Sequence, residues 1–345
     1  MEHLAIDLGG RESQICVRSS DGQIVEERRC RTTALPAYLA TRPRSRVVVE
    51  TCSEAFGIAD AALGIGHEVR VVPSTLARSL GVGARGVKTD RRDARALSEV
   101  SCRIDLPSVH VPSRQARQRK TMCGMREALV SARTKLLNTV RGWLRAEGRR
   151  PRGGDVRSFA ARVRALCADT TLPPSVARQL RTIEALNQAI ADADREVAAT
   201  AKADPIARRL MTVPGIGPST SVRFVAALDE ISRFRGAHAV ESYLGLVPGE
   251  DSSSERRRRT SITKAGPTAL RWCLGQAAWA ARRTRRTDPM QRWADEVEKR
   301  RGTRVAVLAL ARKLAGILYA IWRDGGVYEP HRSSAASSRR TPEGL

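Results

Sequence analysis

An acidic residue ends the first apolar segment of the chain. Residues 4–8 read Leu-Ala-Ile-Asp-Leu, so Asp7 lies where a buried strand is expected to be wholly apolar. A carboxylate is costly to hold in such a place unless something binds it. Glu50 repeats the pattern at the end of the apolar run 47–50. Both positions predict acids that are kept at strand ends for binding.

Two further carboxylates lie three residues apart in a segment with helical composition. Asp90 and Asp93 would share one face of a helix over residues 88–97. Four acids from two strand ends and one helix face would repel one another unless a divalent cation lay between them, and hard oxygen ligands favour Mg²⁺. The pattern predicts a metal-dependent phosphoryl-transfer site with Asp7, Glu50, Asp90 and Asp93 as its metal ligands.

Each of these acids also has an ordinary structural interpretation. Asp7 alone is explained as a strand-end capping residue, and Glu50 as a surface carboxylate. Asp90 and Asp93 would then belong to a solvated helix face, paired with neighbouring arginines. The joint pattern of four acids, rather than any one of them, favours the metal site.

The net charge indicates a polyanionic partner. The 345 residues carry 61 Lys and Arg against 36 Asp and Glu, a formal net charge of +25. Such an excess draws a protein onto nucleic acid. A membrane is the competing polyanion, but the most apolar stretch, residues 305–322, contains Arg312 and Lys313, so no membrane span is predicted. The first residues lack a secretory signal pattern and the seven cysteines form no CxxC pair, so we expect a cytoplasmic protein with reduced thiols.

The first 110 residues predict an α/β domain. Strand patterns cover residues 4–8, 14–18, 24–28, 47–50 and 68–72, with a hairpin turn at residues 20–22. Hairpin strands followed by strand–helix alternation predict a mixed sheet with helices on its faces. That arrangement fits a ribonuclease-H-like domain.

A helical arm is predicted over residues 111–203. A long helix over residues 115–147 and a second over 175–201 carry apolar residues at spacings of three and four. The predicted apolar seam of the first comprises Met122, Met125, Leu129, Ala132, Leu136, Val140 and Trp143 or Leu144. An antiparallel coiled coil explains both helices, and two ordinary helices packed on a globular core explain them equally well.

A mostly helical C-terminal domain is predicted over residues 204–328, followed by a disordered tail over 329–345. The turn Pro-Gly-Ile-Gly at residues 214–217 is typical of a helix-hairpin-helix element, in which Gly215 and Gly217 would let backbone N–H groups approach a phosphate. A plain turn between helices uses the same residues. A further helix is expected over residues 267–283.

Taken together, these segments resemble the IS110/IS1111 family of insertion-sequence transposases. The likeness lies in the order and spacing of the Ile-Asp-Leu-Gly strand, the Val-Glu strand end, residues 88–94 (Lys-Thr-Asp-Arg-Arg-Asp-Ala), the Pro-Gly-Ile-Gly-Pro turn, residues 243–248 (Tyr-Leu-Gly-Leu-Val-Pro), the serines, and residues 262–266 (Ile-Thr-Lys-Ala-Gly). The resemblance implies a RuvC-like domain whose DEDD acids are Asp7, Glu50, Asp90 and Asp93.

The resemblance also implies a serine that attacks DNA. Ser253 takes the serine position, Ser254 replaces the family's usual glycine, and Ser252 is the alternative nucleophile. A serine attack would conserve bond energy in a phosphoserine link until the strand is rejoined. Beside the serines, Arg256, Arg257, Arg258, Arg259 and Lys264 are expected to hold the scissile phosphate or its flanking backbone.

The expected partners are donor and target DNA. The resemblance further implies a homo-oligomer, a dimer or tetramer in which one protomer supplies the acids and another the serine. It also implies a structured guide RNA encoded by the element. The competing functions are a Holliday-junction resolvase or related nuclease, in which the four acids activate water, and a basic nucleic-acid scaffold without catalysis.

Overall fold

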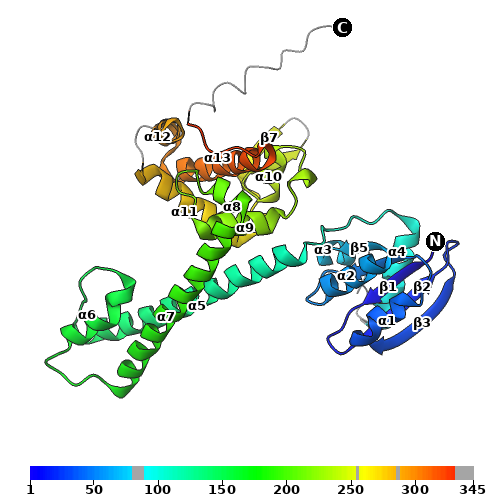
Figure 1. Cartoon of the computed structure of the whole chain (residues 1–345), viewed down its shortest axis with the longest axis horizontal. Helices are drawn as coiled ribbons and strands as arrows, with labels where there is room; N and C mark the ends of the chain where they lie inside the picture. Colours follow the sequence, from blue (N-terminus) through cyan, green and yellow to red (C-terminus); the bar gives the residue numbers. More distant parts are fainter. Residues whose placement is uncertain (80–88, 254–255, 285–287, 331–345) are drawn as a thin grey trace, which may run out of the picture. The chain divides into compact units, whose positions relative to one another are not determined.

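The computed structural model describes residues 1–79, 89–253, 256–284 and 288–330 (Figure 1). Most of the predicted tail, residues 331–345, therefore lies outside the described residues. Contacts between Cα atoms divide the chain into two compact units, Met1–Ser113 and a second that begins at Arg114.

The first unit is built on a five-stranded mixed sheet in the order β3-β2-β1-β4-β5. β1, β2 and β3 pair antiparallel, whereas β4 and β5 extend the sheet from β1 in parallel. The strands are β1 (His3–Asp7), β2 (Glu12–Arg18), β3 (Ile24–Arg31), β4 (Arg46–Glu50) and β5 (Glu68–Val72). The predicted mixed sheet is confirmed, and with its helices it is consistent with a ribonuclease-H-like α/β domain.

Helices cover both faces of this sheet, which is why β1 and β4 are almost wholly apolar. The helices are α1 (Leu35–Ala40), α2 (Ala55–Ile65), α3 (Ser74–Ser79) and α4 (Asp90–Arg103), with a short 3₁₀ turn η1 (Thr32–Ala34) before α1. Ile6 and Val49 belong to the core under α1 and α2. Ala5 and Val48 face the other way and pack with Leu97 of α4.

Two long antiparallel helices begin the second unit, α5 (Arg114–Ala146) and α7 (Pro174–Ala203). The guanidinium of Arg126 pairs with Asp194, and Arg133 Nη1 donates to Asn187 Oδ1 at 3.0 Å, so α5 and α7 run in opposite directions. Between them, η2 (Val156–Ser158) and α6 (Phe159–Leu166) close a small core at the far end of both helices.

The predicted seam of the first long helix is partly wrong. Met125 is 67% exposed and Ala132 is also exposed. The buried positions of α5 instead repeat every seven residues, at Ala116, Cys123, Leu137 and Leu144, with Val140 beside them. The small side chains of Ala116 and Cys123 carry little apolar signal, so the sequence pattern favoured the larger methionine. In α7 the buried residues also follow a seven-residue repeat, at Val176, Ile183, Ile190 and Val197.

The rest of the second unit is a helical core around α13 (Thr303–Asp324), whose Leu310, Leu314 and Leu318 are fully buried. Around it lie α8 (Pro205–Leu210), α9 (Pro218–Leu228), η3 (Ile231–Arg233), α10 (Ala237–Tyr243), α11 (Thr268–Thr284) and α12 (Pro289–Arg301). Among the described helices, α13 alone is long and apolar enough to cross a membrane, with 50% of its apolar window buried. This is weak evidence for a span, because core helices pass the same test.

A two-stranded hairpin, β6 (Pro248–Ser253) and β7 (Arg256–Ile262), interrupts these helices. The sequence analysis did not predict it. Strands are recognised by alternating or continuous apolar residues, and residues 249–261 contain none. The hairpin is held by its backbone ladder and by the turns at its base rather than by an apolar face.

A close backbone contact fixes the turn between α8 and α9 against α11. Gly215 has a φ of +84°, and a Cβ atom there would lie 2.2 Å from the carbonyl oxygen of Ala277 and 2.9 Å from the amide nitrogen of Ala281. Only glycine avoids both the strained φ and the overlap. Gly217, at the start of α9, has a φ of −102° and open space where a Cβ would be.

We predict that Gly215→Ala lowers the free energy of unfolding by about 2–4 kcal/mol, since the added methyl must displace backbone of α11 and occupy a left-handed φ. Gly217→Ala is the matched control and is expected to cost less than about 1 kcal/mol. Chemical denaturation of both variants measures the difference. Equal losses for the two variants would show that the contact with α11 does not matter.

Candidate functional site

Two of the predicted metal ligands end neighbouring strands. Ile6 of β1 lies opposite Val49 of β4 in the parallel register, and Asp7 and Glu50 are the next residues of the two strands. Adjacent strands lie about 5 Å apart, so these two acids are neighbours at the carboxyl edge of the sheet. Alternation along a strand turns both side chains away from the face of Ile6 and toward the face covered by α4.

α4 carries the other two acids to the same edge. The imidazole of His3, at the start of β1, is 2.8 Å from the hydroxyl of Ser101 near the end of α4, so helix and strand run in opposite directions. Asp93 precedes Ser101 by about 12 Å of helix, and Asp7 follows His3 by about 13 Å of strand. Asp93 therefore lies close to the level of Asp7.

The Asp93 side chain is buried although it is an acid. Its residue is 6% exposed, and it lies one turn before Leu97, which packs against the sheet. Asp90 lies on the exposed first turn of the same helix, behind the cap formed by Thr89, whose hydroxyl accepts from the Arg92 amide. The positive end of the helix partly offsets both negative charges.

This donor set fits a hard divalent cation. All four candidates are carboxylates, and carboxylate oxygens are the ligands that hard divalent cations prefer. Among the residues that the structure describes, no three His, Cys, Asp or Glu side chains are gathered tightly enough to hold a metal ion as they stand. The backbone places the acids at one edge, and metal binding would draw their side chains together.

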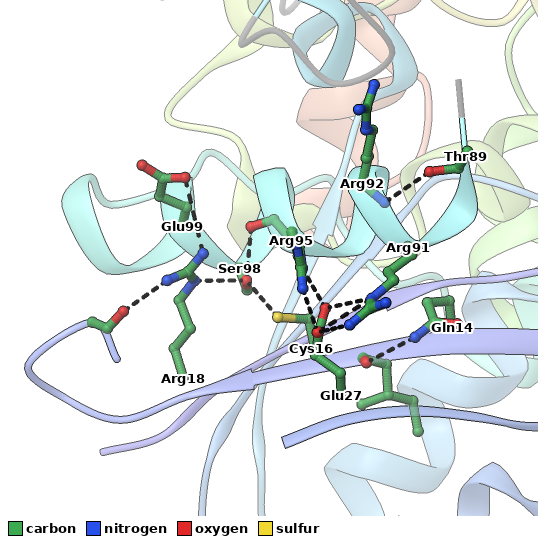
Figure 2. Close-up of polar contacts among 12 residues, drawn as sticks. Gln14, Cys16, Arg18, Glu27, Thr89, Arg91, Arg92, Arg95, Ser98 and Glu99 are labelled. Carbon is green, nitrogen blue, oxygen red and sulfur yellow. Dashed lines mark hydrogen bonds and ion pairs between the residues drawn. The ribbon is translucent and has the colours of Figure 1, made fainter. Parts of the chain in front are cut away.

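A cluster of ion pairs fixes α4 on the sheet (Figure 2). Glu27 of β3 accepts from Arg91 Nη2 at 2.6 Å and from Arg95 Nη2 at 2.5 Å. These two guanidinium groups, Arg95 foremost, lower the pKa of Glu27 to about 2. One turn along, Arg18 Nε of β2 donates to the Ser98 hydroxyl at 3.0 Å.

The sequence analysis missed Glu27, and it named neighbouring arginines as alternative partners of the acids on α4. Two of these, Arg91 and Arg95, instead bind Glu27 from the opposite side of the first turns. Arg91 and Arg95 are four residues apart, so they share one face of the helix beside the two acids. This spacing could have indicated that the helix packs on the sheet through that face. Glu27 thus anchors the first turns of α4, the helix that carries Asp90 and Asp93.

We predict that Glu27→Gln lowers stability near neutral pH and that this loss shrinks in acid. Because the folded-state pKa of Glu27 is depressed, its contribution is present above the unfolded value of 4.5 and is lost as the pH falls toward 2. Unfolding at pH 6 and pH 3, compared with wild type, measures the effect. Glu12→Gln, which breaks an exposed pair with Arg29, is the control. A loss independent of pH would contradict the role of the Glu27 carboxylate.

In the second unit, residues 243–248 and residues 262–266 contact each other at the base of the hairpin. The Thr263 amide donates to the Val247 carbonyl at 2.9 Å, and the Lys264 amide donates to the Gly245 carbonyl at 3.2 Å. A Cβ on Gly245, whose φ is +66°, would lie 2.1 Å from the Ala265 carbonyl oxygen. The glycine is therefore required for the two turns to meet.

The hairpin sets the predicted serine beside the arginine run. Ser253 pairs with Arg256, and Ser252 pairs with Arg257. Ser254 and the side chains of residues 251–259 lie outside the described residues. Lys264 is exposed at the base of the hairpin, whereas Ser253 ends β6 at the other end. The length of one strand, roughly 17 Å, therefore separates the two residues.

The two glycines predicted to approach phosphate have different surroundings. Gly215 contacts the backbone of α11, which accounts for its presence by packing alone. Gly217 leaves open space where a Cβ would lie, beside the first turn of α9.

Two models of protein families match separate parts of the chain. A DEDD-type model of IS110 proteins, described as "Transposase", matches residues 4–147. A model described as "Transposase IS116/IS110/IS902 family" matches residues 207–293. The first match contains all four acids and the second contains the hairpin.

Relatives match along nearly the full length of the chain. The probable family 20 transposase of Pseudomonas aeruginosa is 29% identical over 96% of this chain and 99% of its own length. The transposase for insertion sequence element IS1111A of Coxiella burnetii is 28% identical over 92% of this chain and 88% of its own. The transposase for insertion sequence element IS1328 of Yersinia enterocolitica is 28% identical over 94% of this chain and 98% of its own length.

The structure and the comparisons lead to one assignment. The structure has acids at a sheet edge and a hairpin whose base is formed by residues 243–248 and 262–266, and both the family models and the relatives are transposases. The chain belongs to the IS110/IS1111 family of insertion-sequence transposases, and it is a DNA transposase that cleaves and transfers DNA.

Proposed function

We propose that this transposase cuts and rejoins DNA with Mg²⁺ bound by Asp7, Glu50, Asp90 and Asp93 and with Ser253 as the nucleophile. The observation that carries the metal part is the common placement of these acids: Asp7 and Glu50 end neighbouring parallel strands, and the buried Asp93 lies on the helix that covers that part of the sheet. Carboxylates gathered at one edge repel one another unless a cation lies between them.

In this proposal the acids bind divalent cations, and the cations act on the scissile phosphate. Bound divalent cations would offset charge on the attacking and leaving oxygens of an in-line displacement at phosphorus. The carboxylates hold them at the sheet edge, and the clamp of Glu27 on α4 keeps Asp90 and Asp93 above that edge. Without metal, the four carboxylates repel the phosphates of DNA.

Ser253 supplies the covalent step. Its hydroxyl oxygen would form a bond to phosphorus while the bond from phosphorus to a sugar oxygen breaks, and the freed sugar hydroxyl takes up the proton. The reverse reaction with another strand end restores the serine, so no bond energy is lost to water. The backbone register pairs Ser253 with Arg256 and Ser252 with Arg257, which supports these arginines as partners of the phosphate.

The remaining parts of the proposal concern organisation and partners. We assign the acids to a domain over residues 1–110, the long helices to an arm over 111–203, and the serine to a domain over 204–328. The net charge of +25 supports binding to donor and target DNA. Family resemblance supports a guide RNA, a homo-oligomeric dimer or tetramer, and a cytoplasmic location.

Phosphate contacts are assigned to two places in the second unit. The arginine run Arg256, Arg257, Arg258 and Arg259 forms β7 beside the serines, and Lys264 follows at the base of the hairpin. The turn with Gly215 and Gly217 leads into α9, where Gly217 leaves its side open to a phosphate.

We predict that Asp93→Asn reduces strand exchange by more than about a hundredfold, because one of the charges that hold the metal is lost. Binding to DNA without metal is expected to persist or tighten. Glu99→Gln is the matched control, since Glu99 lies on the same helix and pairs with Arg18 and Arg103. Titration calorimetry with Mg²⁺ provides a second measurement. Wild-type exchange and metal binding in Asp93→Asn would refute the acidic site.

We predict that Ser253→Ala abolishes strand exchange without altering the fold or the affinity for DNA. Wild-type protein incubated with Mg²⁺ and nicked cognate DNA should form an adduct that survives denaturation, and peptide mapping should place the link on Ser253. Ser242→Ala, which alters an exposed serine outside the hairpin, is the control.

The outcomes separate three mechanisms. A link on Ser252 moves the nucleophile by one residue and keeps the covalent mechanism. Cleavage by Ser253→Ala to free ends, with no adduct in the wild type, favours a nuclease in which the acids activate water. Binding without any metal-dependent cleavage favours a scaffold.

A further inference from the structure

α11 presents two tryptophans to solvent on one face. Trp272 is 64% exposed and Trp279 is 39% exposed. Residues seven apart share a helix face, about 10 Å apart along the axis. Exposed Gln276 and Arg283 continue the same stripe. The opposite side of α11 is buried, with Leu274 and Ala278 fully covered in the helical core.

The sequence segment that contains these rings is basic. Residues 256–287 contain ten Lys and Arg and no Asp or Glu. On α11 itself, Arg282 is paired with Glu298 of α12, and Arg271 donates to the carbonyls of Ala265 and Gly266 at 2.7 and 2.9 Å. Arg283 is exposed, and among the described residues its side chain donates to the Trp279 carbonyl of its own helix at 3.3 Å.

We propose that Trp272, Trp279 and Arg283, here named the α11 face, bind unpaired bases of nucleic acid. The two indole rings would stack on bases, and Arg283 would contact the backbone phosphate. The proposal rests on the proposed function, because it assumes that a nucleic acid is the partner of this unit. It adds a binding site for single strands that is separate from the acids and from the serine.

Charge favours nucleic acid over a second copy of this chain as the occupant. Two copies that met through this face would bring together two chains that each carry a formal net charge of +25. Like charges oppose such an isologous contact. A polyanion offsets the same charge, and its bases cover the indole rings.

Geometry favours unpaired bases over duplex DNA. In a duplex, neighbouring bases cover each base face, so an indole ring can stack only on a base that has left the stack. Strand exchange creates such bases. Arg271, next to Trp272, ties α11 to the turns at the base of the hairpin, so the α11 face belongs to the same rigid core as the strand that carries Ser253.

The test measures binding of the full-length protein to a fluorescent 20-nucleotide single strand, as DNA and as RNA, and to a matching duplex. Divalent metal is left out, so neither the acids nor the serine contributes chemistry. Trp272→Ala and Trp279→Ala are each expected to weaken single-strand binding by about 5- to 150-fold. Duplex binding is expected to stay unchanged, and Trp272→Phe is expected to retain most of the affinity.

Trp293→Ala is the matched control. Trp293 is 36% exposed on α12, and the Lys313 ammonium lies 4.3 Å from its ring centre, closer than the 5.8 Å between the Arg282 guanidinium carbon and the ring centre of Trp279. We expect this variant to bind single strands like wild type. Quenching of tryptophan fluorescence by the single strand should decrease in Trp272→Phe, which gives a readout that does not depend on an alanine variant.

Three results would overturn the proposal. One is unchanged single-strand affinity in both alanine variants. The second is an equal loss for single strand and duplex, which would indicate a general electrostatic effect. The third is a change of oligomeric mass in light scattering with unchanged affinity per protomer, which would assign the α11 face to contacts between copies. Because metal is absent, failure of strand exchange in other experiments does not affect this outcome.

Discussion

The docking of α4 on the sheet is the interaction on which the acidic site depends. Asp7 and Glu50 are fixed by the parallel pairing of β1 and β4, but Asp90 and Asp93 reach the same edge only through the position of α4. Leu97 contributes the apolar contact, and the carboxylate of Glu27 holds two arginines of the first turns. This arrangement leaves Asp93 buried above the strand ends.

Prediction from sequence succeeded where apolar pattern determines structure. The runs that end at Asp7 and Glu50 are strands because both faces of the sheet are covered. Prediction from sequence failed where backbone hydrogen bonds or contacts with a distant element determine the structure. The hairpin with Ser253 has no apolar pattern, and the seam of α5 uses Ala116 and Cys123, whose small side chains fit against α7. Ion pairs between distant elements, such as that of Glu27 with α4, leave only an indirect trace in the sequence.

The two units carry complementary chemical groups. The first supplies carboxylates at a sheet edge, and the second supplies a strand of serines beside a strand of arginines. In the second unit, close backbone contacts at Gly215 and Gly245 hold the turns against α11 and against each other. The same core supports the hairpin and the exposed rings of α11, so the proposed covalent and strand-binding functions share one rigid support.

The most direct test of the account is a crystal structure of the protein with Mn²⁺, whose anomalous scattering locates the ion independently of any refined position. We expect anomalous density at the carboxyl ends of β1 and β4, with oxygens of Asp7 and Asp93 at about 2.1 Å from the metal. Density elsewhere on the protein would contradict the account, as would a fully occupied site that lacks Asp93.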